Sequence, residues 1–381
     1  MKQEQFSEKA PGQIVPTEQG DGVAFVPDPL PPTFAIDYKL ANAISEADVA
    51  LAQLNGLART LPDPELLARS FIRVEAVDSS RIEGTQTTYS DLALFEAAQQ
   101  AVEPDTVVVA NYLKALNHGL KMLDTVPVSR RLFCEVHAVL MRGYQEQRSR
   151  PGEIRKGQVV IGPLNAPPKQ ARFVPPPRTY LDDLIADLER FCNNYRELPL
   201  LLRVAMIHYQ FETIHPFWDG NGRVGRLLIL LLLTAEKRLF RPILYLSRFF
   251  EQQRKTYYDL LFAISTEGAW EQWFHFFLEG VRSQAADAEV RIHRLQELRK
   301  RYTDLLESRK RRAFSDVRLL HRLFETPITS IPMVRDQQKL SGPAAKDCIQ
   351  RLAEAGILKR FEYPGNVHYW MATEIIAAVN A

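Results

Sequence analysis

The sequence predicts an all-α protein with one small β-hairpin flap in its middle and a C-terminal unit of helices and strands. Two observations lead to this fold class. Apolar residues recur at helical spacing over most of the chain, and no strands alternate with helices as they do in βαβ units. With 381 residues, of which 46% are hydrophobic and 25% charged, the chain is long enough for two or three domains with packed cores.

The first 34 residues are rich in proline and glycine. Such a composition predicts an irregular arm, and we expect Val23, Phe25 and Val26 to hold it against the body. Helical spacing then begins near Tyr38 and continues through the centre of the chain.

Two of the expected helices carry clear end signals. Segment 63–84 begins with Asp-Pro, which suits the first helical positions, and ends at Gly84, which suits the position after a helix. The run LLILLLLT at 227–234 is much shorter than the roughly 20 residues that cross a bilayer, so it predicts a buried helix. The expected helices are 38–60, 63–84, 91–102, 105–124, 129–145, 178–194, 197–217 and 226–240.

Residues 155–176 depart from the helical pattern. The runs QVVIG (158–162) and ARFVP (171–175) are strand-like and flank a proline-rich loop, so they predict the β-hairpin flap. Residues 285–312 are strongly charged with one apolar stripe, which is typical of a long amphipathic helix that packs on its own chain or on a second subunit. The stripe consists of Ile292, Leu295, Leu298, Tyr302 and Leu305.

The pattern restarts after residue 312 as a small unit. The last of its expected helices has Ser341 as its N-cap and Gly356 after its end. Helix, helix-turn-helix and hairpin, in this order, indicate a winged helix-turn-helix domain. The helices are expected near 314–324, 331–337 and 341–356, followed by two strands within 357–372 around a Pro-Gly-Asn turn.

The patterns divide the chain into five parts. These are an N-terminal arm (1–34), an N-terminal helical region (35–110), a central core (111–280), a connecting helix (281–312) and a winged-helix domain (313–381). The net charge of +2 does not indicate a nucleic-acid-binding protein as a whole, although a local basic patch is compatible with it. Because the three cysteines form no CxxC pair and the first residues contain no apolar leader, we expect a cytoplasmic protein with no membrane partner.

The densest group of polar residues is HPFWDGNGRVGR at 215–226. It contains G-x-G-x-x-G, but a dinucleotide-binding turn needs a preceding strand, and the preceding segment is helical. A P-loop would end in G-K-[ST], which is absent here. A zinc site formed by His215 and Asp219 would lack the third ligand that such sites need.

The glycines and arginines of this stretch suit phosphates better. Gly220, Asn221 and Gly222 let the backbone approach an anion closely, with N–H groups converging at the start of the next helix. Arg223 and Arg226 lie three residues apart, so they can share one helical face and grip successive phosphates.

Two further residues of the stretch suit the chemistry of a nucleotide. Asp219 is a single carboxylate, which suits a Mg²⁺ ion shared with phosphate oxygens. His215 precedes the loop, and an ordinary pKa of about 6.5 lets a histidine act as a neutral base near pH 7. Base, metal ligand and anion site together indicate an attack on a phosphate of a nucleotide.

HPFWDGNGRVGR resembles the signature H-x-F-x-[DE]-G-N-G-R-x-x-R of Fic-domain proteins at every fixed position. PGEIRKGQVVIGP and FVPPP resemble the flap of that family, and SSRIEG (79–84) resembles its inhibitory motif [ST]-x-x-x-E-[GN]. The resemblance extends over residues 25–280. It implies a Fic helical bundle, with the catalytic core at 111–280, that transfers AMP from ATP to a protein hydroxyl.

The resemblance also implies a role for each position of the motif. His215 would deprotonate a Ser, Thr or Tyr of the target protein, and Asp219 would bind Mg²⁺ between the α- and β-phosphates. The ATP-binding positions would be Gly220, Asn221 and Gly222 as an anion hole, Arg223 beside the departing pyrophosphate, and Arg226 at the γ-phosphate.

The inhibitory motif, with Ser79, Glu83 and Gly84 at its fixed positions, supplies a regulatory hypothesis. The resemblance implies that Glu83 pairs with Arg226, so that Arg226 cannot hold the γ-phosphate and ATP binds unproductively. A carboxylate beside a helix C-terminus is in an unfavourable field, which also favours a cationic partner. The alternative is a solvated carboxylate without a partner.

The flap and the base pocket are the remaining parts of the expected site. The flap edge at Val159, Val160, Ile161 and Gly162 could add a strand of the target chain and so place its hydroxyl, or it could simply pack as a hairpin. Residues 244–261 resemble the helix near the adenine. The candidates there are Gln253, Tyr257 and Tyr258, although aromatic residues at this spacing are common in cores.

Two other functions stay open at the level of the sequence. With Mg²⁺ and Glu83 orienting a water molecule, the same site could hydrolyse AMP from a modified protein. The winged helix could instead bind DNA, or it could dock a protein partner or form a homodimer. Candidate DNA contacts are Lys339, Lys346, Arg351, Lys359 and Arg360 for phosphates, and Ser341, Lys346 and Gln350 for bases.

Overall fold

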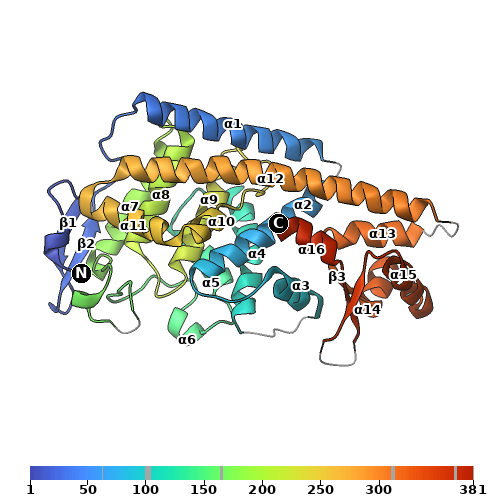
Figure 1. Cartoon of the computed structure of the whole chain (residues 1–381). Helices are drawn as coiled ribbons and strands as arrows, with labels where there is room; N and C mark the ends of the chain where they lie inside the picture. Colours follow the sequence, from blue (N-terminus) through green and yellow to red (C-terminus); the bar gives the residue numbers. More distant parts are fainter. Residues whose placement is uncertain (62, 99–103, 164–165, 310–313, 364–366, 381) are drawn as a thin grey trace.

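The structure, a computed structural model, describes residues 1–61, 63–98, 104–163, 166–309, 314–363 and 367–380. It confirms the all-α fold class with small antiparallel sheets (Figure 1). None of the helices in these ranges is long and apolar enough to cross a membrane. Cys134, Cys192 and Cys348 form no disulfide in the structure.

The helices of the N-terminal region and core are α1 (Tyr38–Thr60), α2 (Pro64–Ile82), α3 (Tyr89–Ala98), α4 (Pro104–Leu123), α5 (Arg130–Leu140), α6 (Glu146–Ser149), α7 (Arg178–Asn194), α8 (Leu200–Ile214), α9 (Asn221–Ala235), α10 (Leu246–Gln252), α11 (Arg254–Glu267) and α12 (Trp270–Glu307). Helices α8 and α9 form the centre, because their side chains are apolar on nearly every face and almost all are buried. Helices α2, α4 and α5 pack on α9, and α12 packs on α8. Helix α12 runs along most of the molecule with α1 beside it (Figure 1).

The prediction of an irregular N-terminal arm is wrong for residues 12–27. Strands β1 (Gly12–Pro16) and β2 (Val23–Pro27) form an antiparallel hairpin, which follows a short 3-10 helix at Gln3–Gln5. Prolines disguise these strands in the sequence, but they lie at strand ends, where a missing N–H does least harm. Phe25 and Val26 are buried as expected, and the Phe25 N–H donates to the carbonyl of Val174 in the flap (3.0 Å).

The flap at 155–176 has less regular structure than the sequence predicts. Its two runs are joined by a single antiparallel bridge, in which Ile161 and Phe173 exchange backbone hydrogen bonds of 2.8 and 3.0 Å. Pro163 and Pro175, on either side of the bridge, have no N–H to donate, so no longer ladder forms.

Several expected helices differ from the observed ones, and the one expected at 226–240 is α9, which begins and ends five residues earlier. Helix α5 stops at Leu140 rather than at 145, and Gly143 (φ +73°) separates it from α6. The segment 244–261 is two helices, α10 and α11, that meet at Gln253. The connecting helix begins at Trp270 as part of α12, so the expected boundary at 280 falls inside a helix, as the one at 110 falls inside α4.

The apolar stripe of α12 is confirmed except at its end. Ile292, Leu295, Leu298 and Tyr302 are buried against the chain itself. Leu305 is 38% exposed, and Leu306 is buried in its place. An α-helix has 3.6 residues per turn, so a buried stripe advances by three or four residues, and the step after Tyr302 is four residues instead of the expected three.

The C-terminal unit contains the expected helices α13 (Phe314–Leu323), α14 (Ile331–Gln338) and α15 (Gly342–Glu354). It also contains strands β3 (Ile328–Ser330), β4 (Lys359–Phe361) and β5 (Tyr369–Met371), in the antiparallel order β3-β5-β4, of which β3 was not expected. The Pro-Gly-Asn turn lies outside the described residues. The winged-helix assignment therefore stays a prediction, although the order of elements agrees with it.

The C-terminal unit is docked on α2. Ser70 donates through Oγ to the carbonyl of Phe324 (2.9 Å), and the buried Arg73 donates to the carbonyl of Glu325. The last helix, α16 (Thr373–Asn380), also packs on α2 as well as on α3 and α12. Helix α2 is thus one of the elements that contact both the C-terminal unit and the core.

Candidate active site

The motif 215–226 forms the turn between α8 and α9. His215 follows the last residue of α8 in a left-handed conformation (φ +51°), and its N–H donates to the carbonyl of Phe211 (3.0 Å). Gly220 (φ +78°) precedes α9. A left-handed histidine costs conformational energy, and such residues cluster at functional sites.

The side chain of Asn221 closes this turn. Its Oδ1 accepts from the N–H of Phe217 (2.8 Å), and its Nδ2 donates to the carbonyl of Phe217 (2.9 Å). Both polar atoms of the Asn221 side chain are therefore bonded within the loop. At this position only the backbone N–H is left to bind an anion. The first N–H groups of α9, at Asn221, Gly222 and Arg223, have no carbonyl partner within their own helix.

A second histidine, His137 on α5, packs against this turn, and no pattern in the sequence pointed to it. Its ring stacks on that of Phe217, with centroids 3.9 Å apart. Nδ1 accepts from the N–H of Gly152 (2.8 Å), so Nε2 carries the proton and donates to the carbonyl of Asp219 (2.9 Å). Burial lowers the pKa of His137 to about 4, which keeps it neutral and fixes one face of the loop.

His215 has the tautomer that a base needs. Its Nδ1 lies 3.2 Å from the carbonyl oxygen of Glu212, which can only accept, so Nδ1 carries the proton and Nε2 keeps a lone pair. Burial, and then the positive charge of Arg155, lower the pKa of His215 to about 4. The side chain is therefore neutral at pH 7, as the sequence predicts.

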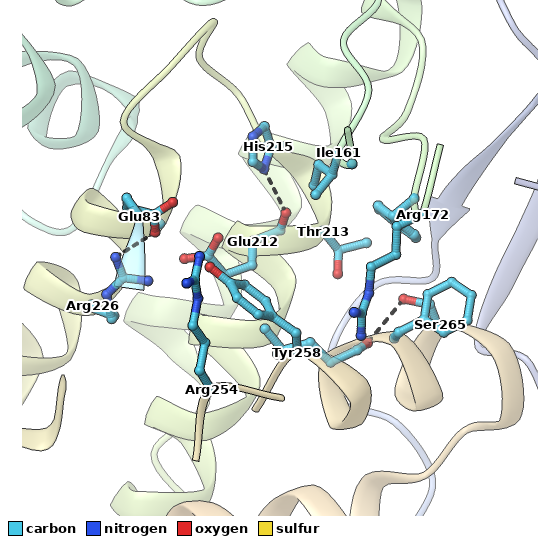
Figure 2. A pocket seen from close by; sticks show the side chains of 15 residues that line it. Glu83, Ile161, Arg172, Glu212, Thr213, His215, Arg226, Arg254, Tyr258 and Ser265 are labelled. Atoms are coloured by element: carbon cyan, nitrogen blue, oxygen red, sulfur yellow. Dashed lines mark hydrogen bonds and ion pairs between the residues drawn. The ribbon is translucent and has the colours of Figure 1, made fainter. Parts of the chain in front are cut away.

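The ion pair expected between Glu83 and Arg226 is present (Figure 2). Arg226 is 1% exposed and donates through Nη2 to Glu83 Oε1 (2.7 Å) and to the carbonyl of Ser79 (2.8 Å), and through Nε to Ser79 Oγ (3.0 Å). Burial opposes the ionisation of Glu83, but Arg226 and Arg223 outweigh it, so the pKa of Glu83 lies below its ordinary value. Gly84 (φ +96°) ends α2 at this point.

Gly222 leaves the space that this pair occupies. A Cβ atom at position 222 would lie 2.3 Å from Glu83 Oε1 and 3.0 Å from Nη1 of Arg226. Ser79, Glu83 and Arg226 thus meet over the start of α9, which is also where the sequence places the anion site.

Asp219 and Arg223 lie at the mouth of the turn. Asp219 Oδ1 accepts from the Gly220 N–H (2.6 Å) and from Nη2 of Arg223 (3.3 Å), and the Asp219 side chain is 41% exposed. Arg223 is buried, and its Nε has no hydrogen-bond partner among the described residues. No three metal-binding side chains come together in the described ranges, so a Mg²⁺ ion here would depend on Asp219, water and ligand phosphates, which fits the usual coordination of this ion.

A cavity of about 350 Å³ brings Glu83, His215, Gly222 and Arg226 together, whereas Asp219 and Arg223 do not line it. Figure 2 shows Glu83 and Arg226 on one side of the cavity and Arg172 and Ser265 on the other. His215 lies between these two sides, next to the flap residue Ile161. The lining residues are Glu83, Ile161, Gly162, Arg172, Phe173, Glu212, Thr213, His215, Gly222, Arg226, Arg254, Tyr258, Leu261, Phe262 and Ser265.

The structure keeps only part of the expected base pocket and flap edge at this cavity. Tyr258 lines it, whereas Gln253 is exposed at the junction of α10 and α11. Tyr257 is fully buried in an aromatic cluster and bonds to Nε2 of His208 (2.8 Å). Ile161 and Gly162 line the cavity, but Val159 and Val160 do not.

The expected DNA contacts of the C-terminal unit are partly used within the chain. Arg351 binds both carboxylate oxygens of Asp316 at 2.7 Å, and Ser341 caps α15 by accepting from the Ala344 N–H (3.3 Å). Gln350 donates to Glu354 (3.3 Å). Lys339, Lys346, Lys359 and Arg360 are exposed.

Glu212 is a cavity residue that the sequence analysis missed. Its Oε1 is buried without a hydrogen-bond partner among the described residues, and Gly225 leaves room for it, since a Cβ at 225 would lie 2.2 Å from that oxygen. Burial raises the pKa of Glu212 to about 8 despite the opposing effect of Arg226. Glu212 is therefore protonated at neutral pH.

We expect Glu212→Gln to stabilise the fold at pH 8 by on the order of 4 kcal/mol, at about 1.4 kcal/mol for each pKa unit, and at pH 5 by less than about 1 kcal/mol. The folded pKa of about 8 lies above the ordinary 4.5, so the wild type loses stability as the pH rises between these values, while glutamine stays neutral. Urea unfolding at both pH values measures the difference. Glu271→Gln, on the exposed face of α12, is the control, and an equal effect of Glu212→Gln at both pH values would contradict the prediction.

Comparisons with known proteins agree with this site. Residues 41–121, which include α2, match the Fic/DOC family N-terminal region, and residues 127–233, which include the motif, match the Fic/DOC family. A probable protein adenylyltransferase of Aquifex aeolicus is 27% identical over 180 residues, 45% of this chain and 51% of that protein. The protein adenylyltransferase Fic of Culex quinquefasciatus is 25% identical over 241 residues, 61% of this chain and 44% of that protein.

Solved structures share the fold. A Fic family protein from Desulfovibrio desulfuricans G20 has a TM-score of 0.59 at 20% identity, covering 90% of this chain and 98% of that one. Fic-1 (aa134 - 508) from C. elegans has a TM-score of 0.50 at 18% identity, covering 68% and 74%. The chain spans about half, or less, of the length of the curated relatives. The two consecutive family matches, the complete motif and the shared fold show that the chain belongs to the Fic/DOC family.

Proposed function

We propose that the protein is an adenylyltransferase that transfers AMP from ATP to a Ser, Thr or Tyr hydroxyl of a target protein or of itself, and that Glu83 holds it inactive. The observation that carries this proposal is the 2.7 Å contact between Glu83 and Arg226 in the cavity that also contains His215 with its free Nε2. A cavity of 350 Å³ lies in the range of small-molecule sites.

The side chains suit each part of this reaction. Nε2 of His215 takes the proton of the target hydroxyl, whose oxygen then bonds to the α-phosphorus as the bond to pyrophosphate breaks. The first N–H groups of α9 and the unpartnered Nε of Arg223 stabilise the charge that grows on the phosphate oxygens. Asp219 would hold Mg²⁺, which supplies further neutralisation of phosphate charge when bound.

Labelled ATP tests the reaction class. Glu83→Gly protein incubated with Mg²⁺ and ATP should retain label from the α-phosphate and none from the γ-phosphate, with release of pyrophosphate. Retention of γ-label would indicate phosphorylation instead, and the absence of both labels from the protein and from any added lysate protein would refute the transferase proposal.

Asp219→Asn should lower AMP transfer by on the order of 100-fold, and excess Mg²⁺ should recover part of the loss. The reason is that Asp219 is the half-exposed carboxylate at the mouth of the turn and the ligand we assign to the metal. Initial rates at several Mg²⁺ concentrations measure the effect, with Asp183→Asn on the exposed face of α7 as the control. A rate that does not depend on Mg²⁺ in either protein would contradict the assignment.

Hydrolysis of AMP from a modified protein is a second candidate, because the carboxylate of Glu83 lines the same cavity as His215. Glu83 could orient a water molecule there for attack on the bound phosphate. AMP-modified target incubated with wild type and with Glu83→Gly separates the two functions. Hydrolysis requires Glu83, whereas transfer does not.

A further inference from the structure

Arg155 is a buried arginine that binds backbone instead of a carboxylate. It is 0% exposed, and no ion pair involves it among the described residues. Its guanidinium donates to four carbonyl oxygens, and a buried charge without an anionic partner is costly, so such an arrangement needs a reason. The four contacts are Nε to His215 (2.8 Å), Nη1 to Gly157 (2.8 Å), and Nη2 to Pro176 (2.6 Å) and Ile214 (3.3 Å).

These contacts join two parts of the site that are far apart in sequence. Ile214 and His215 are the end of α8 and the start of the catalytic turn, and the Arg155 N–H adds a bond to the carbonyl of Pro216 (2.9 Å). Gly157 and Pro176 lie near the two ends of the flap. One planar side chain thus fixes the backbone of the histidine relative to both ends of the flap.

We propose that Arg155 is a positioning residue that sets the base and the flap in one fixed relation, so that a hydroxyl held at the flap meets Nε2 of His215. The proposal rests on the proposed function for the identity of the reaction. A lysine cannot replace the arginine, because its single ammonium nitrogen cannot donate to all four carbonyl oxygens that surround the planar guanidinium group.

The charge of Arg155 adds a second, electrostatic signature. The charged or titratable groups that face His215 are Arg155 itself, Glu83 from α2 and Asp219 from the turn, while Glu212 and Arg226 line the same cavity. Arg155 lowers the pKa of His215, whereas Glu83 and Asp219 raise it. Removing the arginine charge should therefore make His215 easier to protonate, an effect that a purely structural role elsewhere in the core would not produce.

The kinetic test compares Arg155→Lys with Arg203→Lys, both in the Glu83→Gly background. Arg203 is an equally buried arginine that binds the carbonyl of Tyr195 (2.9 Å) and Glu236 (3.0 Å), at the far end of α8. We expect Arg155→Lys to lower kcat by about 100-fold with KM for ATP almost unchanged, since misplacing reacting groups costs rate rather than ATP affinity. Equal kcat values for the two variants would overturn the proposal.

A titration separates this inference from the proposed function. In histidine-labelled protein, with the His215 signal assigned by its absence from His215→Ala, Arg155→Gln should raise the pKa of His215 by about 1 unit, and Arg203→Gln should not. The measurement needs no enzymatic activity, so it decides on Arg155 even if Glu83→Gly transfers no AMP. A His215 pKa that is unchanged in Arg155→Gln contradicts the proposal.

If the Arg155 variants do not fold, the wild type still tests it. The Nε–H of Arg155, which donates to the carbonyl of His215, should then be among the slowest arginine signals to exchange with solvent. Exchange at the rate of an exposed arginine would overturn the proposal.

Discussion

Replacing Glu83 with glycine should raise the rate of AMP transfer by about 10- to 100-fold, the range of typical couplings between two sites. In the wild type, Nη2 of Arg226 donates to the Glu83 carboxylate. We propose that the same guanidinium binds the γ-phosphate of ATP. Without Glu83, Arg226 keeps its two bonds to Ser79 and can turn one donor to the nucleotide. Initial rates with α-labelled ATP measure the change.

Glu83→Gln is the matched control, because it keeps a hydrogen-bond acceptor and removes only the charge. We expect a smaller rise than with glycine. Equal rates for wild type, Glu83→Gln and Glu83→Gly would exclude an inhibitory role of the pair.

Glu83→Gly should also lower the free energy of unfolding by about 1 kcal/mol at pH 7. Solvent screening keeps this value small, because the Glu83 side chain is 35% exposed. The folded pKa of Glu83 lies below the ordinary 4.5, so this stabilisation is present above pH 4.5 and is lost as the pH falls through the lower folded value. Thermal unfolding of wild type and Glu83→Gly should therefore differ at pH 7 and converge in acid.

His215→Ala should lower AMP transfer by about 1,000-fold in the Glu83→Gly background, the size of a general-base contribution. The KM for ATP should stay close to its original value, because the phosphate donors are on α9 and its arginines rather than on the histidine. His293→Ala, an exposed histidine on α12, is the control. A loss that appears only in KM would assign His215 to binding and not to proton transfer.

The sequence was most informative where the chemistry is local. The twelve residues 215–226 contain the candidate base, the candidate anion site and two arginines together. The resemblance extended this to the pairing of Glu83 with Arg226, and this contact is present in the structure. Burial of Phe25 and of residues 227–233 also followed from composition alone.

The missed residues share a physical reason. His137, Arg155 and Glu212 are single polar residues within otherwise ordinary segments, so their surroundings depend on the tertiary fold. Distant backbone carbonyls accept from His137 and Arg155, whereas Oε1 of Glu212 is buried without a hydrogen-bond partner among the described residues. The hairpin β1–β2 was missed because its prolines also suit an irregular arm. The flap was predicted too regular, since sequence shows strand propensity but not which carbonyls find a donor.

Helix α2 is held at two places, and this links the C-terminal unit to the cavity. Near its middle, Ser70 and Arg73 donate to the carbonyls of Phe324 and Glu325, and at its end Ser79 and Glu83 bind Arg226. The backbone hydrogen bonds of the helical segment between these two places resist stretching, so a shift of the C-terminal unit would also shift the end of α2. Removal of the C-terminal unit would break the contacts of Ser70 and Arg73 with that unit. In a shortened protein, α2 would keep only the second set of contacts, those of Ser79 and Glu83 with Arg226.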